Sequence, residues 1–409
     1  MTAQQVLSTL DATNTWQEQL YKHLHQNPEL STQEVETAAE ITRRLESFGY
    51  AVQQIGGGVV GVLDNGPGPV VLFRADIDAL PVQEATGLPY ASTKTAVDPD
   101  GNTVPVMHAC GHDMHIAAGL GAAELLAEHK GAWSGTYIAL FQPAEETASG
   151  ALSMVADGLV DKVPRPDVAL GQHVLAGPPA GHLATCPGPA LSTTASMRVL
   201  VHGTGSHGSM PHLGVDAVVI AAAVVTRLQT IVARELAPGT FGVVTVGSLQ
   251  AGTKSNIIPA EATLLANVRA YDDAVRERLL AAIERIARAE CEAAAAPRPP
   301  EFDVYEQAPV TDNDEATTST VTSAFERHFG PERVHRMSPV TASEDFSVIP
   351  SAWSIPYCYW GFGGFTPDQE AVPNHHPGFA PAIQPTLRTG TEAAVTATLA
   401  FLGTGTGTG

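Results

Sequence analysis

Three apolar runs, each followed at once by polar side chains, constrain the fold of this chain more than any other feature. The runs are Val70–Arg74, Thr136–Phe141 and Val168–Val174. A continuous apolar run predicts a strand that is covered on both faces, which is typical of the parallel sheets of α/β proteins. The carboxyl ends of such strands meet at one edge of the sheet, where binding sites collect. The sequence therefore predicts an α/β fold with a site at this edge.

The polar residues after these runs each have two interpretations. Asp76 and Asp78 follow the first run and are either site residues or ordinary turn residues. Glu145 and Glu146 follow the second run. Adjacent glutamates are common on helix faces, but after a buried strand both can face one cavity, where one ligates a metal and the other abstracts a proton. His173 ends the third run and is either a hydrogen-bonded core residue or a metal ligand; its position after a third such strand favours ligation.

Residues 107–115 crowd three histidines, one cysteine and one aspartate into nine positions. The thiolate of Cys110 and the imidazole of His112 suit a borderline-soft divalent metal. A turn-rich loop, Asp98–Asn102, precedes this cluster, and an Ala/Leu-rich helix is predicted from Ile116 to Lys130. A small buried cysteine and a redox cysteine are the alternatives, although the sequence offers no neighbouring thiol to resolve the second. The density of the cluster favours a metal site.

Length and charge limit the class of protein. A chain of 409 residues predicts two domains. A net charge of −21 disfavours nucleic acid and anionic membrane as partners. The chain opens without a basic and apolar leader, and its longest apolar run, Val215–Val225, is too short to span a bilayer. Four widely spaced cysteines show no paired framework. We therefore expect a cytoplasmic protein.

Two helices are predicted before the first apolar run. The first covers Trp16–His25. Ser31 or Thr32 is predicted to cap the second, which runs through Phe48, with Glu34 completing a capping box for Ser31.

The texture of the sequence changes after Pro189. A β-α-β-β-α block, roughly Pro189 to Arg298, predicts a separate α+β sandwich. Its predicted elements are a strand over 191–202, a helix over 215–235, strands over 242–250 and 261–270, and a helix over 272–294. The α/β texture then returns, and the Gly/Thr repeat at the end predicts a mobile tail.

Ten short motifs follow one another along nearly the whole chain. They are His25–Glu29, Arg74–Pro81, Cys110–Asp113, Glu145–Glu146, Ser206–His207, Pro211–His212, Asn256 with Pro259, Arg269, Ser343–Phe346 and His375–Phe379. By these motifs the chain resembles the aminoacylase/carboxypeptidase family of metal-dependent amidohydrolases. It is most similar to the branch of hippurate hydrolases, N-acyl-amino-acid aminoacylases and auxin-conjugate hydrolases. Within that branch it resembles N-acylglutamine aminoacylases, although no residue specifies glutamine.

The resemblance implies a larger catalytic domain with a mixed sheet flanked by helices, interrupted by a smaller α+β lid and dimerisation domain. The catalytic domain would comprise residues 1–188 and 301–402, the smaller domain 189–300, and a flexible tail 403–409. The resemblance also implies a homo-oligomer, either a dimer or a dimer of dimers.

The resemblance further implies one or two divalent ions per chain. The implied ligands are Cys110, His112, Glu146, His173 and His375. Cysteine with histidine favours zinc, and manganese is the alternative. The family more often has Ser or Asn where this chain has His376, so His376 competes with His375, which the spacing to Phe379 favours.

The remaining implied roles concern proton transfer and substrate binding. Glu145 would be the general acid/base, while Asp78 and Asp113 would support the ligands from behind. His207 would reach from the smaller domain, in this family often across a dimer interface, to the developing oxyanion. The substrate carboxylate would be held by Asn256 and Arg269.

The chemistry of these residues suits amide hydrolysis. A metal would polarise the poorly electrophilic amide, and Glu145 would take a proton from water and deliver it to the leaving nitrogen. We therefore predict cleavage of N-acyl-amino acids to a carboxylic acid and a free amino acid. A dipeptidase or carboxypeptidase with the same machinery is the alternative enzyme. A metal-binding protein without catalysis is the alternative of another class, and the intact Glu145 argues against it.

Overall fold

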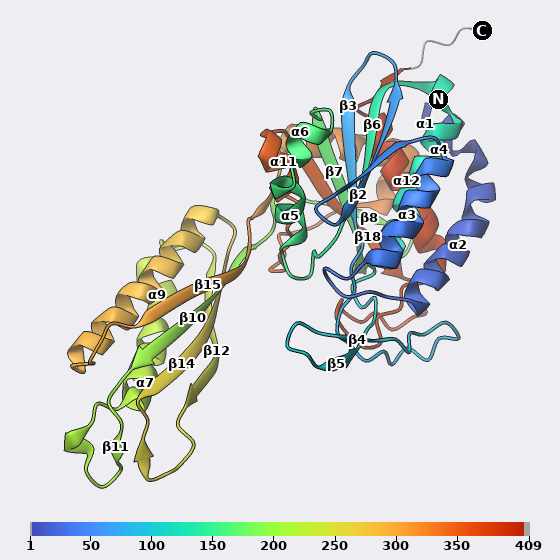
Figure 1. Ribbon diagram of the computed structural model, residues 1–409. Helices are drawn as coiled ribbons and strands as arrows, with labels where there is room; N and C mark the ends of the chain where they lie inside the picture. The colour runs from blue at the N-terminus through green and yellow to red at the C-terminus, as the bar shows by residue number, and fades with distance from the viewer. Residues whose placement is uncertain (1, 405–409) are drawn as a thin grey trace. The chain divides into compact units, whose positions relative to one another are not determined.

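The computed structural model describes residues 2–404, which form two compact units (Figure 1). Of the described residues, the larger unit holds 2–190, 312–338 and 345–404. The smaller unit holds Leu191–Thr311 and Pro339–Glu344. Among residues 2–404, no helix is both long enough and apolar enough to cross a membrane.

A mixed sheet forms the centre of the larger unit, with the strand order β1-β2-β6-β3-β7-β18-β8-β17. Its four central strands, β6, β3, β7 and β18, run parallel. They are β6 (Trp133–Gln142), β3 (Val70–Asp76), β7 (Val168–Pro179) and β18 (Tyr357–Phe365). The other strands are β1 (Ala51–Ile55), β2 (Gly58–Asn65), β8 (Leu183–Thr185) and β17 (Val334–Arg336). The three predicted apolar strands therefore lie side by side in this parallel core.

Helices cover both faces of this sheet. Figure 1 shows α2, α3, α4 and α12 on one side and α5, α6 and α11 on the other. Their bounds are α2 (Leu10–Gln26), α3 (Val35–Ser47), α4 (His112–Glu128), α5 (Gly150–Ala156), α6 (Leu159–Lys162), α11 (Val348–Trp353) and α12 (Ile383–Leu399). Almost every residue of α4 is buried, because it packs on β3, α2 and α12 at once. Alanine and glycine dominate α4 and permit this close approach.

Three predicted helix starts are wrong. The first predicted helix, α2, begins at Leu10 rather than Trp16. The helix after the cysteine–histidine cluster begins at His112 rather than Ile116, so the second half of the cluster lies on its first turn. The capping box at the start of α3 is also wrong. α3 begins after Glu34, and the backbone N–H groups of its second and third residues, Glu36 and Thr37, donate instead to the carboxylate of Glu29, at 3.1 and 2.8 Å.

The smaller unit is an antiparallel sheet of order β12-β14-β10-β15 with α7 and α9 packed on it. Its strands are β10 (Thr193–His202), β12 (Gly242–Ala251), β14 (Glu261–Ala270) and β15 (Glu301–Ala308). Aspartates cap both helices by accepting backbone N–H groups: Asp216 for α7 (Ala217–Leu228) and Asp272 for α9 (Asp273–Ala293). The helix predicted over 215–235 is in fact two, α7 and α8 (Thr230–Glu235). Two short strands that are far apart in sequence, β11 (Ser206–His207) and β13 (Ile257–Ile258), pair antiparallel at one end of the sheet and form the β11–β13 ribbon.

The smaller unit extends further along the chain than the predicted domain, which ended at residue 300. β15 belongs with it because it pairs with β10, and residues 339–344 join it because Leu191 bridges Val340. The predicted tail 403–409 is described only in part. Its first two residues pair with β6 as β19 (Gly403–Thr404), and residues 405–409 lie outside the described part of the chain.

Candidate active site and metal centre

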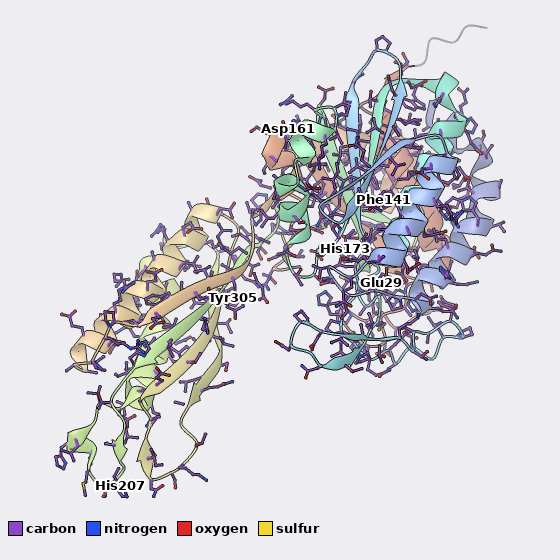
Figure 2. The ribbon with its side chains drawn as sticks, in the orientation of Figure 1. Glu29, Phe141, Asp161, His173, His207 and Tyr305 are labelled. Carbon is purple, nitrogen blue, oxygen red and sulfur yellow. The ribbon has the colours of Figure 1, made fainter. Side chains whose placement is uncertain are left out.

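The ends of two parallel strands deliver three of the predicted site residues. Asp78 follows β3, and Glu145 and Glu146 follow β6. His173 lies inside β7 rather than at its end, because that strand continues to Pro179. Figure 2 labels His173 in the larger unit and His207 at the tip of the β11–β13 ribbon in the smaller unit.

The link between Cys110 and His112 depends on a glycine. Gly111 has a φ of +84°, a left-handed conformation that other residues adopt only at a cost. A Cβ atom at Gly111 would lie 2.3 Å from Cγ1 of Val174, so the position also lacks room. The turn lets the cysteine precede the helix while His112 begins it.

The five predicted metal ligands come together in the larger unit. The Nε2 atom of His375 lies 3.2 Å from Oε2 of Glu146. The Sγ atom of Cys110 lies 3.4 Å from Nε2 of His173. The Nε2 atom of His112 lies 3.8 Å from Oε1 of Glu146 and 3.9 Å from Oε2 of Glu145.

Hydrogen bonds sort the neighbouring histidines into two kinds. Nδ1 of His112 lies 2.9 Å from the carbonyl oxygen and 3.1 Å from Oδ1 of Asp78, so it carries the proton. Nδ1 of His173 likewise donates to the carbonyl oxygen of Val174, at 2.7 Å. In both rings this leaves the Nε2 lone pair for a ligand. His115 differs, because its Nε2 accepts the Val174 N–H at 2.8 Å while Nδ1 contacts Asp76.

The atoms that face the cluster fit a divalent ion. Nε2 of His112 and Oε1 of Glu146 are buried and have no hydrogen-bond partner within residues 2–404. Leaving such an atom buried and unsatisfied costs about 1–3 kcal/mol, and more for a charged group. A metal ion would satisfy both atoms. The combination of imidazole, thiolate and carboxylate donors suits zinc and also admits manganese.

The two candidate histidines His375 and His376 make different contacts. His375 adopts a φ of +69° and directs its Nε2 at Glu146. The Nδ1 atom of His376 instead accepts the N–H of Gly378, at 3.0 Å.

The electrostatic environment of the cluster favours a cation. Burial lowers the pKa of His112, but the carboxylates of Asp76 and Asp78 outweigh burial and raise it to about 10. Burial raises the pKa of Cys110 well above its usual value, and Glu146 and Glu145 raise it further. Carboxylates contribute to both shifts, and a divalent cation would neutralise this concentration of negative charge.

A buried ion network behind the cluster was missed by the sequence analysis. Arg74, which is fully buried in β3, donates to Oδ2 of Asp76 at 2.6 Å and to Oε1 of Gln142 at 2.9 Å. Arg74 also lies 3.4 Å from Oδ1 of Asp345, which accepts from Gln142 at 2.6 Å. The network holds the ends of β3 and β6 together. Its sequence signals are the motifs Arg74–Pro81 and Ser343–Phe346, which do not show that their charged residues pair.

A second network supports the start of α4. Nδ1 of His25 lies 2.7 Å from Oδ2 of Asp113, and its Nε2 lies 3.1 Å from Oε1 of Glu84. The backbone N–H of Ala85, next to Glu84, donates to the carbonyl oxygen of Pro377 at 2.8 Å. His25 therefore connects the helix that carries His112 with a segment that contacts the His375 loop.

The predicted residues of the smaller unit lie at two separate ends of its sheet. His207 and Asn256 are together on the β11–β13 ribbon, where the Gly208 N–H donates to the Asn256 carbonyl oxygen at 2.8 Å. Arg269 lies near the other end of β14, where it donates to the Thr341 carbonyl oxygen at 2.7 Å. Eight residues of β14 alone span roughly 26 Å at ~3.3 Å per residue. One copy of this unit therefore does not bring Asn256 and Arg269 to the same carboxylate.

Known proteins resemble this chain in sequence over most of its length. The N-acetyl-L-cysteine deacetylase of Bacillus subtilis is 35% identical over 365 residues, which cover 88% of this chain and 82% of the relative. The hippurate hydrolase of Campylobacter jejuni is 36% identical over 340 residues, covering 81% and 84%. The N-acyl-L-amino acid amidohydrolase of Geobacillus stearothermophilus is 35% identical over 319 residues, covering 77% and 83%.

Solved structures confirm the predicted fold class. A protein from methicillin-resistant Staphylococcus aureus, described as a candidate aminohydrolase, superposes with a TM-score of 0.87 at 33% identity, covering 98% of this chain and 99% of that one. A dinuclear metal-binding peptidase from Bacillus subtilis gives a TM-score of 0.78 at 28% identity, covering 96% and 99%. Residues 72–399 match the family described as peptidase family M20/M25/M40. As its motifs predicted, the chain belongs to this family of metal-dependent hydrolases.

Proposed function

We propose that this protein hydrolyses N-acyl-L-amino acids to a carboxylic acid and a free amino acid, with a divalent metal. The observation that carries the proposal is the pairing of a ligand cluster, in which buried His112 and Glu146 atoms have no protein partner among residues 2–404, with a second glutamate beside it. Relatives named for N-acetylcysteine, hippurate and N-acyl-L-amino acids support the substrate class. Glutamine as the amino acid stays a prediction.

Five residues would hold the metal. They are Cys110, His112, Glu146, His173 and His375. We favour zinc, with manganese as the alternative, and one or two ions per chain. When bound, the metal polarises the amide carbonyl and lowers the pKa of a bound water towards ~7.

Glu145 would move the proton. It is largely buried, and its Oε2 lies 3.9 Å from Nε2 of His112, close to the ligands without joining the His375–Glu146 contact. In this position Glu145 takes a proton from the attacking water and later donates it to the leaving nitrogen. Asp78 holds His112 from behind, and Asp113 is held by His25.

Substrate binding would require two copies of the chain. His207 would donate to the developing oxyanion, and Asn256 and Arg269 would hold the substrate carboxylate. Because His207 and Asn256 lie at the opposite end of the smaller unit from Arg269, one chain does not supply all three to one substrate. Two chains can supply all three residues, if the β11–β13 ribbon of each chain contacts the substrate that is bound at the metal ligands of its partner.

The surface of the smaller unit supports such a homodimer. Large apolar side chains are exposed close to the β11–β13 ribbon and along α7 and β12. They are Met210, Leu213, Val218, Val219, Leu249 and Ile257. β12 also ends the strand order of the sheet, so its outer edge can pair with a second copy.

The decisive experiment is an assay of metal-dependent amino acid release. The purified protein would be stripped of metal, reloaded with Zn²⁺ or Mn²⁺, and given N-acetyl and N-benzoyl amino acids, N-acylglutamine among them. Free dipeptides would test the dipeptidase or carboxypeptidase alternative, which predicts that the protein cleaves dipeptides faster than the N-acyl amino acids. Metal binding without any hydrolysis would instead identify a non-catalytic metal protein.

The compartment stays a prediction. All four cysteines, which lie within the described residues, are buried and free. Free thiols suit the reducing cytoplasm that we propose for this enzyme.

A further inference from the structure

The turn that carries the two site glutamates has an unusual backbone. Ala144, the residue before Glu145, has a φ of +48°. The left-handed conformation costs a residue with a Cβ roughly 1–2 kcal/mol. The orientation of Glu145 and Glu146 relative to β6 follows from this conformation, so something must stabilise it.

One long-range hydrogen bond holds this residue. The Ala144 N–H donates to Oε1 of Glu34 at 2.8 Å, and both groups are buried. Glu34 is 110 residues away in sequence, just before α3, and its side chain is only 5% exposed. The Glu34 side chain does not cap α3, where Glu29 accepts the N–H groups of Glu36 and Thr37.

A neighbouring contact holds the same turn at a second point. Ser31 donates its hydroxyl to Oδ2 of Asp78 at 2.7 Å, and the same oxygen accepts the Glu146 N–H at 3.1 Å. The segment from Ser31 to Glu34 therefore restrains the turn on either side of Glu145, directly at Ala144 and through Asp78 at Glu146.

Side chains do not fill the space beside Glu34 and this turn. A cavity of about 420 Å³ lies there, lined by Glu34 and by Pro143, Ala144, Ser149 and Gly150 of the turn. Burial raises the pKa of Glu34 to about 7, the Asp78 carboxylate raises it too, and backbone N–H donors, Ala144 among them, oppose the shift. The chain therefore keeps a carboxyl group where its charge is disfavoured, and the Ala144 N–H of the turn is the hydrogen-bond donor that this group receives from outside its own segment.

We infer that Glu34 is a positioning residue for the reaction. By accepting the Ala144 N–H it maintains the turn in which Glu145 reaches the water while Glu146 reaches the metal. This inference rests on the proposed function.

The test compares variants at two neighbouring glutamates. Glu34→Ala removes the acceptor, Glu34→Gln retains an amide oxygen in its place, and Glu29→Ala removes only the contact to the start of α3. We expect Glu34→Ala to lower kcat and to weaken metal binding, each by about 10–100-fold, as losses of groups that support metal ligands typically do. Glu34→Gln should stay within a few-fold of the wild type. Glu29→Ala should lower the melting temperature but leave kcat and metal affinity unchanged.

Kinetics, chelator competition for Zn²⁺ and thermal unfolding are measured on each variant. Wild-type kcat and metal affinity in Glu34→Ala would overturn the inference, as would equal losses in Glu29→Ala or a Gln variant as impaired as the Ala variant. If Glu34→Ala does not fold, Glu34→Leu takes its place, since it fills the volume without an acceptor. Metal affinity tests the positioning role even if the wild type hydrolyses none of the N-acyl substrates, so the two proposals fail separately.

Discussion

The adjacent glutamates Glu145 and Glu146 have different surroundings. We therefore expect substitution of Glu145 to lower kcat and substitution of Glu146 to weaken metal binding. Glu146 contacts His375 and has a buried oxygen without a hydrogen-bond partner among the described residues, whereas Glu145 stands beside His112. Glu145→Gln should retain metal and lose kcat by ~10²–10⁴. Glu146→Gln should first weaken metal binding, and added metal should partly restore activity.

Metal stoichiometry and kcat would be measured together for both variants. Glu46→Gln, at an exposed glutamate on α3, serves as the control and should behave as wild type. A metal-depleted Glu145→Gln beside a metal-replete, inactive Glu146→Gln would show that the two roles are reversed.

His25 predicts a pH dependence of stability. Burial lowers its pKa, but hydrogen bonds to Asp113 and Glu84 outweigh burial and raise it to about 10 from the usual 6.5. The folded protein then binds this proton more tightly than the unfolded chain. The stabilisation is complete below pH ~6.5 and is lost as the pH rises through the folded pKa.

Chemical denaturation at pH 6, 8 and 10 would measure this effect. The difference in unfolding free energy between the wild type and His25→Gln should be greatest at pH 6 and should shrink steadily towards pH 10. A difference that is constant across this range would mean that His25 has a similar pKa in both states.

Single residues also mark the limit of the sequence analysis. The cluster around Cys110 was recognisable because ligand residue types are dense there. His112 was selected over His115 as a ligand, but the hydrogen bonds that set the two rings apart were not predictable, because their partners Asp78 and Val174 come from other strands. The role of Glu34 was misassigned for the same reason, since its partner Ala144 lies far along the chain.

At the scale of elements, the junction between Cys110 and α4 depends on one glycine. Gly111 and Gly101 both have a φ of +84°, but only Gly111 is crowded, because a Cβ atom there would lie 2.3 Å from Cγ1 of Val174. Gly101→Ala should therefore cost only the left-handed penalty of roughly 1–2 kcal/mol. Gly111→Ala should cost ~1–3 kcal/mol more through overpacking and should weaken metal binding.

Urea denaturation of both apo variants gives the comparison, with metal affinity measured alongside. Equal destabilisation of the two variants would show that β7 relaxes around the added methyl group. Intact metal affinity in Gly111→Ala would show that the ligand geometry tolerates a shift of this turn.

Elements were predictable where their pattern is local. The apolar runs correctly placed β3, β6 and β7, and the strand predicted over 261–270 matches the bounds of β14, Glu261–Ala270. Helix starts were less predictable, because the group that caps α3 is Glu29 rather than the nearer Ser31. β15 was assigned to the wrong unit because its partner strand, β10, lies about a hundred residues earlier.

At the scale of the whole molecule, the change of sequence texture near Pro189 predicted two units, and the structure has two. The family and its metal-dependent chemistry were predictable because ordered motifs survive when the rest of the sequence diverges. The sequence did not reveal that Asn256 and Arg269 lie at opposite ends of one sheet, since strand length becomes distance only in the fold.

This separation leads to a prediction about two chains acting together. If the β11–β13 ribbon of one chain contacts the substrate at the metal ligands of its partner, His207→Ala and Glu145→Gln chains should each be inactive alone. In a mixed dimer, the His207→Ala chain supplies an intact Glu145 and the Glu145→Gln chain supplies an intact His207. One complete site results. Random mixing makes half of the dimers mixed, each with one site of two, so roughly a quarter of wild-type activity should return.

The experiment unfolds and refolds the two variants together, in the presence of metal, and compares the activity with that of each variant refolded alone. Wild-type protein taken through the same procedure sets the scale, and sedimentation gives the oligomeric state. If His207 acts within its own chain, every site in the mixture lacks one group and no activity returns. Recovery of activity would therefore establish both the dimer and the exchange of His207 between chains, because neither defective chain can complete a site by itself.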